Sequence, residues 1–137
     1  MALAADVKIG QQYLHVYSVH FESRDGPSRA AQAAEVADDG LRQPFDIVIG
    51  GDTNAAGYLE DLRQGTQQDA CTQEFLRHGY ADAHTGLPPS GRVTTMSGVA
   101  IDLIFGSASF VDAGIGDAMR WSRLSDHLPV WARVHLR

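Results

Sequence analysis

Asp52 and Asn54 are the residues whose types and spacing first suggest chemistry. They follow the apolar segment 45–49 and the pair Gly50-Gly51. The apolar run predicts a strand, and the glycines allow the main chain to turn sharply and approach a ligand closely. If the chain stays extended, the carboxylate and the amide project together and suit a hard cation and a phosphate oxygen. The same residues are typical of a strand followed by an Asx-type turn, which this segment alone favours.

Four further polar residues occupy comparable positions beside or within predicted strands. They are His20 at the end of strand 13–21, Asp102 inside strand 99–105, and Asp126 and His127 ahead of strand 130–136. Each has an ordinary explanation on its own, namely a surface or core histidine, a solvent-facing edge-strand carboxylate, or a turn. A carboxylate such as Asp102 needs a partner if it is buried. The remaining histidines are interpreted as structural or surface residues, and they are His15, His78, His84 and His135.

The predicted elements alternate between strands and helices. Strand 13–21 is apolar on both alternating faces, so we expect an interior strand covered on both sides. Helix 29–39 is expected to begin at an N-cap Ser28 and to close at a C-cap Gly40. Residues 1–10 carry no clear pattern. The other expectations are a loop with a short helical turn over 55–69, a helix over 72–78 ended by Gly79, a functional or flexible loop over 84–97 and a strand over 109–115.

Composition narrows the classes of protein. The 137 residues allow one domain, and 11 basic against 17 acidic residues give a net charge of −6, which does not favour polyanion binding. Cys71 is the single cysteine, which excludes an internal disulfide and a cysteine-based zinc site. No apolar run approaches the roughly 18 residues of a membrane span, and the N-terminus does not resemble a signal peptide. We therefore expect a cytoplasmic protein.

Four motifs in order resemble the endonuclease/exonuclease/phosphatase superfamily, the DNase I-like metal-dependent phosphoesterases. They are Val-Tyr-Ser-Val-His-Phe ending at Phe21, Gly-Gly-Asp-Thr-Asn ending at Asn54, Ile-Asp-Leu-Ile-Phe ending at Phe105, and Ser-Asp-His-Leu-Pro-Val ending at Val130. The resemblance runs along nearly the whole chain but covers only the second half of the family's domain. The family's early strand with an Asn and its metal-binding Glu have no counterpart. Thr53 also departs from the usual apolar or aromatic residue.

The resemblance implies a role for each matching residue. Asp52 would orient or deprotonate water or help to hold a metal, and Asn54 would contact the nucleophile or the phosphoryl oxygen. Asp126 would be a metal-side carboxylate. His127 would contact the scissile phosphate, with Asp102 fixing its tautomer. His20 would be a second histidine at the phosphate, so the implied catalytic set is His20, Asp52, Asn54, Asp102 and His127, and the implied metal set is Asp126, Asp52 and Asn54.

The resemblance also implies a fold. Residues 1–137 would be the C-terminal portion of one α/β (α+β) domain, part of a four-layered α/β/β/α sandwich that lacks its N-terminal half. A longer protein or a second chain would then complete the sheet. Oxygen ligands favour Mg²⁺ or Mn²⁺, and phosphodiester hydrolysis needs a cation and preorganised donors. These requirements support the residue types independently of the resemblance.

Three functional hypotheses follow from the sequence. The first is a Mg²⁺- or Mn²⁺-dependent hydrolase, a phosphoesterase or nuclease acting on a phosphate ester in nucleic acid, phospholipid or a small molecule. The alternative is a non-catalytic binding module that cannot assemble the metal site. A generic α/β domain is the third, and the four ordered motifs argue against it. The fold does not choose among substrates.

Overall fold

The chain is built around a mixed five-stranded sheet with the strand order β1-β2-β3-β5-β4. The computed structural model describes residues 1–65, 69–117 and 124–136. The strands of this sheet are β1 (Ala2–Ile9), β2 (Gln12–His20), β3 (Asp46–Tyr58), β4 (Ala81–Asp82) and β5 (Val99–Gly106). Strands β2 and β3 run parallel across α1 (Gly26–Gly40), whereas the other pairs are antiparallel. The sequence predicted this succession of strand, helix and strand.

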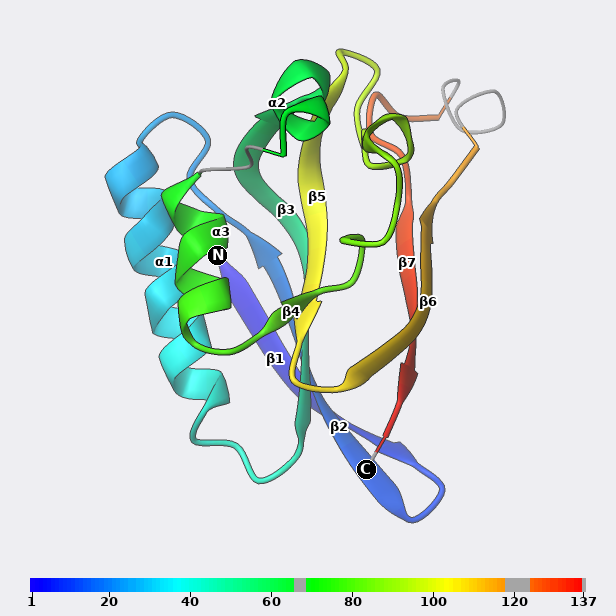
Figure 1. Ribbon diagram of the computed structural model, residues 1–137. Helices are drawn as coiled ribbons and strands as arrows, with labels where there is room; N and C mark the ends of the chain where they lie inside the picture. Colours follow the sequence, from blue (N-terminus) through cyan, green and yellow to red (C-terminus); the bar gives the residue numbers. More distant parts are fainter. Residues whose placement is uncertain (66–68, 118–123, 137) are drawn as a thin grey trace.

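Three layers are visible in the molecule (Figure 1). Helices α1 and α3 (Ala70–Arg77) cover one face of the five-stranded sheet. On the other side lies a two-stranded ribbon, β6 (Ser109–Ile115) paired with β7 (Val130–His135). The core lies between the helices and the sheet, where Phe75 stacks on Phe105 with a ring-centroid distance of 4.8 Å. This arrangement is the α/β architecture that the sequence predicted.

Strand β2 is buried along one face, whereas its other face is buried at Leu14 and open toward its C-terminal end. Tyr17 and Val19 are buried on the side of the helices, whereas Ser18 and His20 on the opposite side are exposed. The strand and its interior position were predicted, but the expectation of cover on both sides is wrong toward its C-terminal end, at Ser18 and His20. The physical reason is that the β6–β7 ribbon packs against β5 through β7, at the far side of the sheet from β1.

Strand β1 was not predicted. Every one of its residues is exposed, so it has no buried face whose apolar side chains could produce an alternating pattern. The ladder with β2 defines it instead, from Ala2 opposite Val19 to Ile9 opposite Gln12. The connecting turn contains Gly10 with φ of 64°, a conformation typical of a two-residue hairpin.

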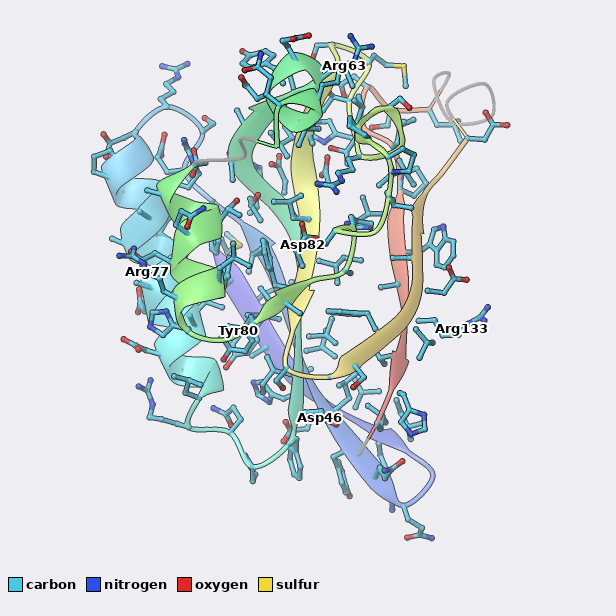
Figure 2. The ribbon with its side chains drawn as sticks, viewed as in Figure 1. Asp46, Arg63, Arg77, Tyr80, Asp82 and Arg133 are labelled. Atoms are coloured by element: carbon cyan, nitrogen blue, oxygen red, sulfur yellow. The ribbon has the colours of Figure 1, made fainter. Side chains whose placement is uncertain are left out.

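The ends of α1 differ from the prediction. Asp25 is the N-cap, because its carboxylate accepts a hydrogen bond from the Ser28 amide, so Ser28 is already inside the helix. Gly40 is the last helical residue and is not a left-handed cap. A Cβ at Gly40 would overlap the hydroxyl of Tyr80, which donates a 3.0 Å hydrogen bond to the Ala37 carbonyl. Figure 2 labels Tyr80 where the chain passes from α3 to β4.

The segment expected to be a loop over 55–69 is partly regular. Strand β3 continues to Tyr58, and the expected short helical turn is α2 (Leu59–Arg63). The predicted helix over 72–78 is α3, capped by the Asp69 carboxylate on the Cys71 amide. The loop over 84–97 contains only the short 3-10 helix η1 (Pro89–Gly91). Within the described part of the chain, no helix has the length and apolar character needed to cross a membrane.

Tyr17 connects the sheet to α1 and provides a test of this packing. Its hydroxyl donates a 2.6 Å hydrogen bond to Asp39, and this bond lowers the pKa of Asp39. We expect Tyr17→Phe to lower the free energy of unfolding by about 1 kcal/mol at neutral pH, because Asp39 is partly exposed and screened. The bond's contribution is present above the unfolded pKa of about 3.9 and is lost as pH falls.

Urea denaturation at pH 7 and pH 3 measures this effect. The difference from the parent protein should shrink at pH 3, which lies below the unfolded pKa of about 3.9. Tyr13→Phe is the matched control, because Tyr13 lies on the same strand and is exposed. An equal loss of stability at both pH values would contradict the assignment to the charged Asp39.

Candidate active site

Three candidate residues form one transverse row across the sheet. His20 on β2 is the register partner of Asp52 on β3, and Asp52 is the register partner of Asp102 on β5. Side chains at directly opposed positions of neighbouring strands point to the same face, with their Cβ atoms about 5 Å apart. This face is the one away from α1, because the alternate residue Val19 is buried on the helix side. The row therefore gathers residues from three separate motifs on one surface.

Gly51 sets the position of Asp52 in this row. Its φ is 143°, and a Cβ there would collide with the carbonyl oxygen of Val19 on β2. Only glycine allows β3 to approach β2 this closely immediately before the carboxylate. The predicted close approach of the backbone at the glycine pair therefore occurs at Gly51, but it is toward the neighbouring strand.

Asn54 does not continue the extended path of β3. Its φ is 50°, and the register against β5 shifts between Asp52 and Gly57. The Asn54 amide donates a 2.9 Å hydrogen bond to the Asp52 carboxylate, which is the Asx-type turn that the local sequence favoured. The Asn54 side-chain amide donates to the Phe21 carbonyl at 3.0 Å. The condition for projecting Asp52 and Asn54 together, an extended chain, is therefore not met, although the turn keeps them in contact.

Thr53 lies at the centre of the register shift and is buried. Its hydroxyl donates a 2.8 Å hydrogen bond to the carbonyl of Ile101, which has no register partner on β3. The same hydroxyl accepts a hydrogen bond from the Ala55 amide at 3.3 Å. An apolar residue at this position would leave a main-chain carbonyl without this donor. The departure of Thr53 from the family pattern thus has a structural role.

His127 reaches the row from the segment before β7. Its Nδ1 lies 2.9 Å and 3.1 Å from the two carboxylate oxygens of Asp102, so Nδ1 carries the proton. The Asp102 side chain is only 14% exposed, whereas that of His127 is 34% exposed. Burial raises the pKa of Asp102, and a Thr94 hydrogen bond and the nearby His127 oppose that rise. Asp102 thus has the partner that a buried carboxylate requires, and β5 is an interior strand.

His20 is the most solvent-accessible member of the site. Its Nε2 lies 3.6 Å from the Asp52 carboxylate, and its side chain is 71% exposed. An exposed imidazole beside a carboxylate is available to an incoming substrate from solution. His20 therefore faces the open side of the row.

Asp52, Asp102 and His127 form a group that could hold a metal ion. One ligand atom from each lies within 4.8 Å of the others. Because Asp102 is hydrogen-bonded to His127, part of this proximity is explained by their pairing. Asp126 is exposed and outside this group, and its main-chain carbonyl accepts a 2.9 Å hydrogen bond from Met96. The carboxylates of Asp52 and Asp102 and the neighbouring Asn54 amide nevertheless offer the oxygen donors that a hard divalent cation prefers.

Four histidines lie outside the transverse row, as expected. His15 pairs with Asp6 at 2.5 Å, and His78 pairs with Asp38 at 3.0 Å. His84 is buried, and burial lowers its pKa. His135 is exposed on β7. None of these four is in the group of possible metal ligands found among the described residues.

Cys71 is also excluded as a nucleophile. It lies on α3 and is fully buried, and burial raises its pKa to about 12. A thiol that stays protonated at neutral pH does not attack a substrate. The candidate chemistry therefore belongs to the carboxylates and imidazoles of the row.

The overall fold matches solved structures. An endonuclease/exonuclease/phosphatase from Bacteroides vulgatus superposes with a TM-score of 0.74 at 18% identity, covering 99% of this chain and 55% of that one. A protein described in the same words from Beutenbergia cavernae gives 0.75 at 19% identity, covering 98% and 39%. TDP2 from D. rerio, crystallised with a single-strand DNA product, gives 0.70 at 19% identity, covering 98% and 61%. No family model and no curated protein matches the sequence.

These comparisons establish the fold. The chain has the architecture of endonuclease/exonuclease/phosphatase proteins. It spans 55% of the length of the Bacteroides vulgatus protein and 61% of that of D. rerio TDP2. The predicted family resemblance and fold class are confirmed at this level. The motifs that carried the resemblance are the ones that the sheet brings together.

Asp102 allows a test that separates function from stability. Its raised pKa means that the folded state disfavours the ionised form, so its contribution to stability is full below the unfolded pKa of about 3.9 and is lost as pH rises. Asp102→Asn should therefore melt about 2–5 °C higher than the parent protein at pH 7 and show no such gain near pH 3. Thermal unfolding across this pH range measures the difference.

Asp112→Asn on the exposed part of β6 is the matched control. It should show little change at either pH. A lower melting temperature for Asp102→Asn at pH 7 would mean that the ion pair with His127 stabilises the fold more than burial opposes it.

Proposed function

We propose that the protein is the C-terminal portion of a metal-dependent phosphoesterase that hydrolyses a phosphate ester with water. The observation that carries the proposal is the transverse row His20, Asp52 and Asp102 with His127 hydrogen-bonded at its end. A buried carboxylate that costs stability while it orients an accessible imidazole is typical of a site arranged for chemistry. The shared fold with phosphoesterase and nuclease neighbours supports the same reaction class.

Each residue has a role that its position permits. Asp102 accepts the hydrogen bond from His127 Nδ1, and the cationic imidazole can in addition donate from Nε2 to a phosphate oxygen. His20 lies at the solvent side, where it can donate a proton to the leaving oxygen. Asp52 lies between His20 and the Asp102–His127 pair, and it can orient or deprotonate the attacking water. Asn54, held beside Asp52, can donate to the nucleophile or the phosphoryl oxygen.

The metal set proposed from this chain is Asp52, Asn54 and Asp126. Bound Mg²⁺ or Mn²⁺ would supply positive charge that stabilises the developing charge on phosphate oxygens. Mg²⁺ commonly uses only one or two protein carboxylates and keeps several waters, so a partial set of oxygen ligands fits its chemistry. Asp102 is assigned to His127 and not to the metal, because both of its oxygens lie within hydrogen-bonding distance of Nδ1.

Substitution at the row tests the catalytic proposal. In the full-length protein with Mg²⁺ or Mn²⁺, Asp52→Ala and His127→Ala should each lower the hydrolysis of an activated aryl phosphodiester by at least about a hundredfold, the scale of preorganised charge stabilisers. His78→Ala is the matched control, because His78 pairs with Asp38 at the end of α3. Steady-state rates before and after chelation with EDTA provide the measurement. Unchanged rates in both row variants would reject the assigned roles.

A non-catalytic binding module of the same fold is the competing proposal, supported by the absence of Asp126 from the group of possible ligands found in the described chain. Millimolar Mg²⁺ or Mn²⁺ should raise the melting temperature if the metal site assembles, because a ligand that binds only the folded state stabilises it. Asp52→Ala should abolish that rise. A melting temperature that does not respond to either ion, together with no turnover, would favour the binding module.

Nucleic acid is the substrate class to test first. TDP2 from D. rerio was crystallised with a single-strand DNA product, and a Neisseria meningitidis neighbour is described as a 3'-5' exonuclease. The chain's net charge of −6 means that attraction to a polyanion must come from bound cations or from a further portion of the protein. Phospholipid and small phosphorylated molecules are the other two classes. The cytoplasmic location expected from the sequence stays a prediction.

A second polypeptide portion is proposed to complete the sheet beside β1. Leu3 and Val7 are 67% and 42% exposed, and both lie on the same face of the edge strand. An exposed apolar edge strand is a template for further pairing. The neighbours contain additional chain that this protein does not match. Residues 1–137 would then be one portion of a larger domain, completed by its own N-terminal half or by a second chain.

Lysine substitution tests this open edge. Leu3→Lys with Val7→Lys should reduce self-association and binding of an apolar fluorescent dye by the isolated chain, because charges on an edge strand oppose pairing. Size-exclusion chromatography with light scattering and dye fluorescence give the readouts. Leu41→Lys is the matched control, because Leu41 is 61% exposed beyond α1. A monomer that binds no dye before substitution would contradict the proposal.

A further inference from the structure

Thr94 occupies an unusual position beside the Asp102 strand. It is fully buried, and its hydroxyl accepts hydrogen bonds from the main-chain amides of Ile101 at 3.0 Å and Asp102 at 3.1 Å. Its own amide donates to the Val99 carbonyl at 3.0 Å. These bonds connect Thr94 to three residues of β5, namely Val99, Ile101 and Asp102. A side-chain hydroxyl thus fixes the main chain from which the Asp102 carboxylate projects.

The reason that a side chain is needed here lies in the register shift. Ile101 falls between the paired positions Ala100 and Asp102 and has no register partner on β3. The Thr53 hydroxyl serves its carbonyl, and the Thr94 hydroxyl serves its amide. Two threonines from different segments therefore replace main-chain partners at the point where the row is built. A buried main-chain group without such a partner would be costly.

The segment that contains Thr94 also bonds to the main chain around His127, ahead of β7. The Leu128 amide donates a 2.7 Å hydrogen bond to the Thr94 carbonyl, and the Met96 amide donates a 2.9 Å hydrogen bond to the Asp126 carbonyl. Between these two bonds, Thr95 forms an antiparallel bridge with His127. The segment Thr94 to Met96 is therefore a short strand-like connector between the two members of the Asp102–His127 pair.

We infer that Thr94 is a positioning residue that aligns His127 on Asp102. One residue bonds the main chain of Asp102 through its hydroxyl and the main chain of Leu128, next to His127, through its carbonyl. The 2.9 Å contact between the imidazole and the carboxylate therefore depends on Thr94, which joins the main chains of the two residues' segments directly. The consequence for turnover rests on the proposed function, whereas the alignment itself does not.

Three variants test the alignment. Thr94→Val keeps the shape and removes the hydroxyl, and Thr94→Ser keeps the hydroxyl. Thr72→Val removes a buried hydroxyl that has no hydrogen-bond partner among the described residues. The readout is the resonance of the proton on His127 Nδ1, recorded at one fixed pH. We expect Thr94→Val to lose or shift this resonance and Thr94→Ser and Thr72→Val to keep it. An unchanged resonance in folded Thr94→Val overturns the inference.

Hydrogen exchange extends the test and does not depend on a variant that folds. In the parent protein, the amides of Ile101, Asp102 and Leu128 should exchange with one common opening free energy, because Thr94 links them. Leu128 exchanging independently of the other two overturns the inference, even if Thr94→Val does not fold. In folded Thr94→Val, the Leu128 amide should exchange at least about tenfold faster.

Turnover gives a third readout if the parent protein hydrolyses a phosphodiester. Thr94→Val should lower kcat by about 10- to 100-fold, because a small misplacement of a catalytic group is costly, while KM changes little. Thr94→Ser should restore most of the rate. Absence of turnover in the protein completed by its N-terminal half would reject the proposed function, and the resonance and exchange results would still decide the role of Thr94.

Discussion

The close approach of β3 to β2 at Gly51 is the constraint on which the candidate site depends. A side chain at Gly51 would collide with the Val19 carbonyl, so β3 would have to move away from β2. The in-register pairing of His20 with Asp52 follows directly from this approach, and the pairing of Asp52 with Asp102 continues it across the next strand. The main-chain packing between the parallel strands therefore sets where the polar side chains of the candidate site lie.

His127 joins the row from a different layer of the molecule. It precedes β7 of the two-stranded ribbon, whereas the other members belong to the five-stranded sheet. A buried carboxylate at Asp102 meets it, and burial raises the pKa of that carboxyl group. The fold thus holds an unfavourable charge where two layers meet, and the hydrogen bond to His127 is its compensation. Such a conflict between stability and local charge is expected where side chains are arranged for a reaction.

The two faces of the sheet have different surroundings. Helices α1 and α3 cover one face with an aromatic and aliphatic core, whereas the β6–β7 ribbon lies against β5 and leaves β1 exposed (Figure 1). The outer surface of the ribbon is mixed, because Arg133 on β7 (Figure 2) shares its face with Trp131, which is 44% exposed. The solved structures of the same fold contain substantial chain beyond the matched portion. The open edge and the greater length of these neighbours are the two observations behind the proposal that a further portion completes the sheet.

The sequence by itself determined the kinds of residue and the local elements. The aromatic and β-branched pattern gave β2, the alanine-rich run gave α1, and the ordered motifs gave the candidate site residues, because these signals are local. Tertiary structure alone decided β1, which has no buried face, and the cap at Asp25, which depends on where the helix starts. It also decided the turn at Asn54 and the role of Thr94, because both follow from the register of β3 against β5. Register is set by contacts between strands distant in sequence, and no local pattern records it.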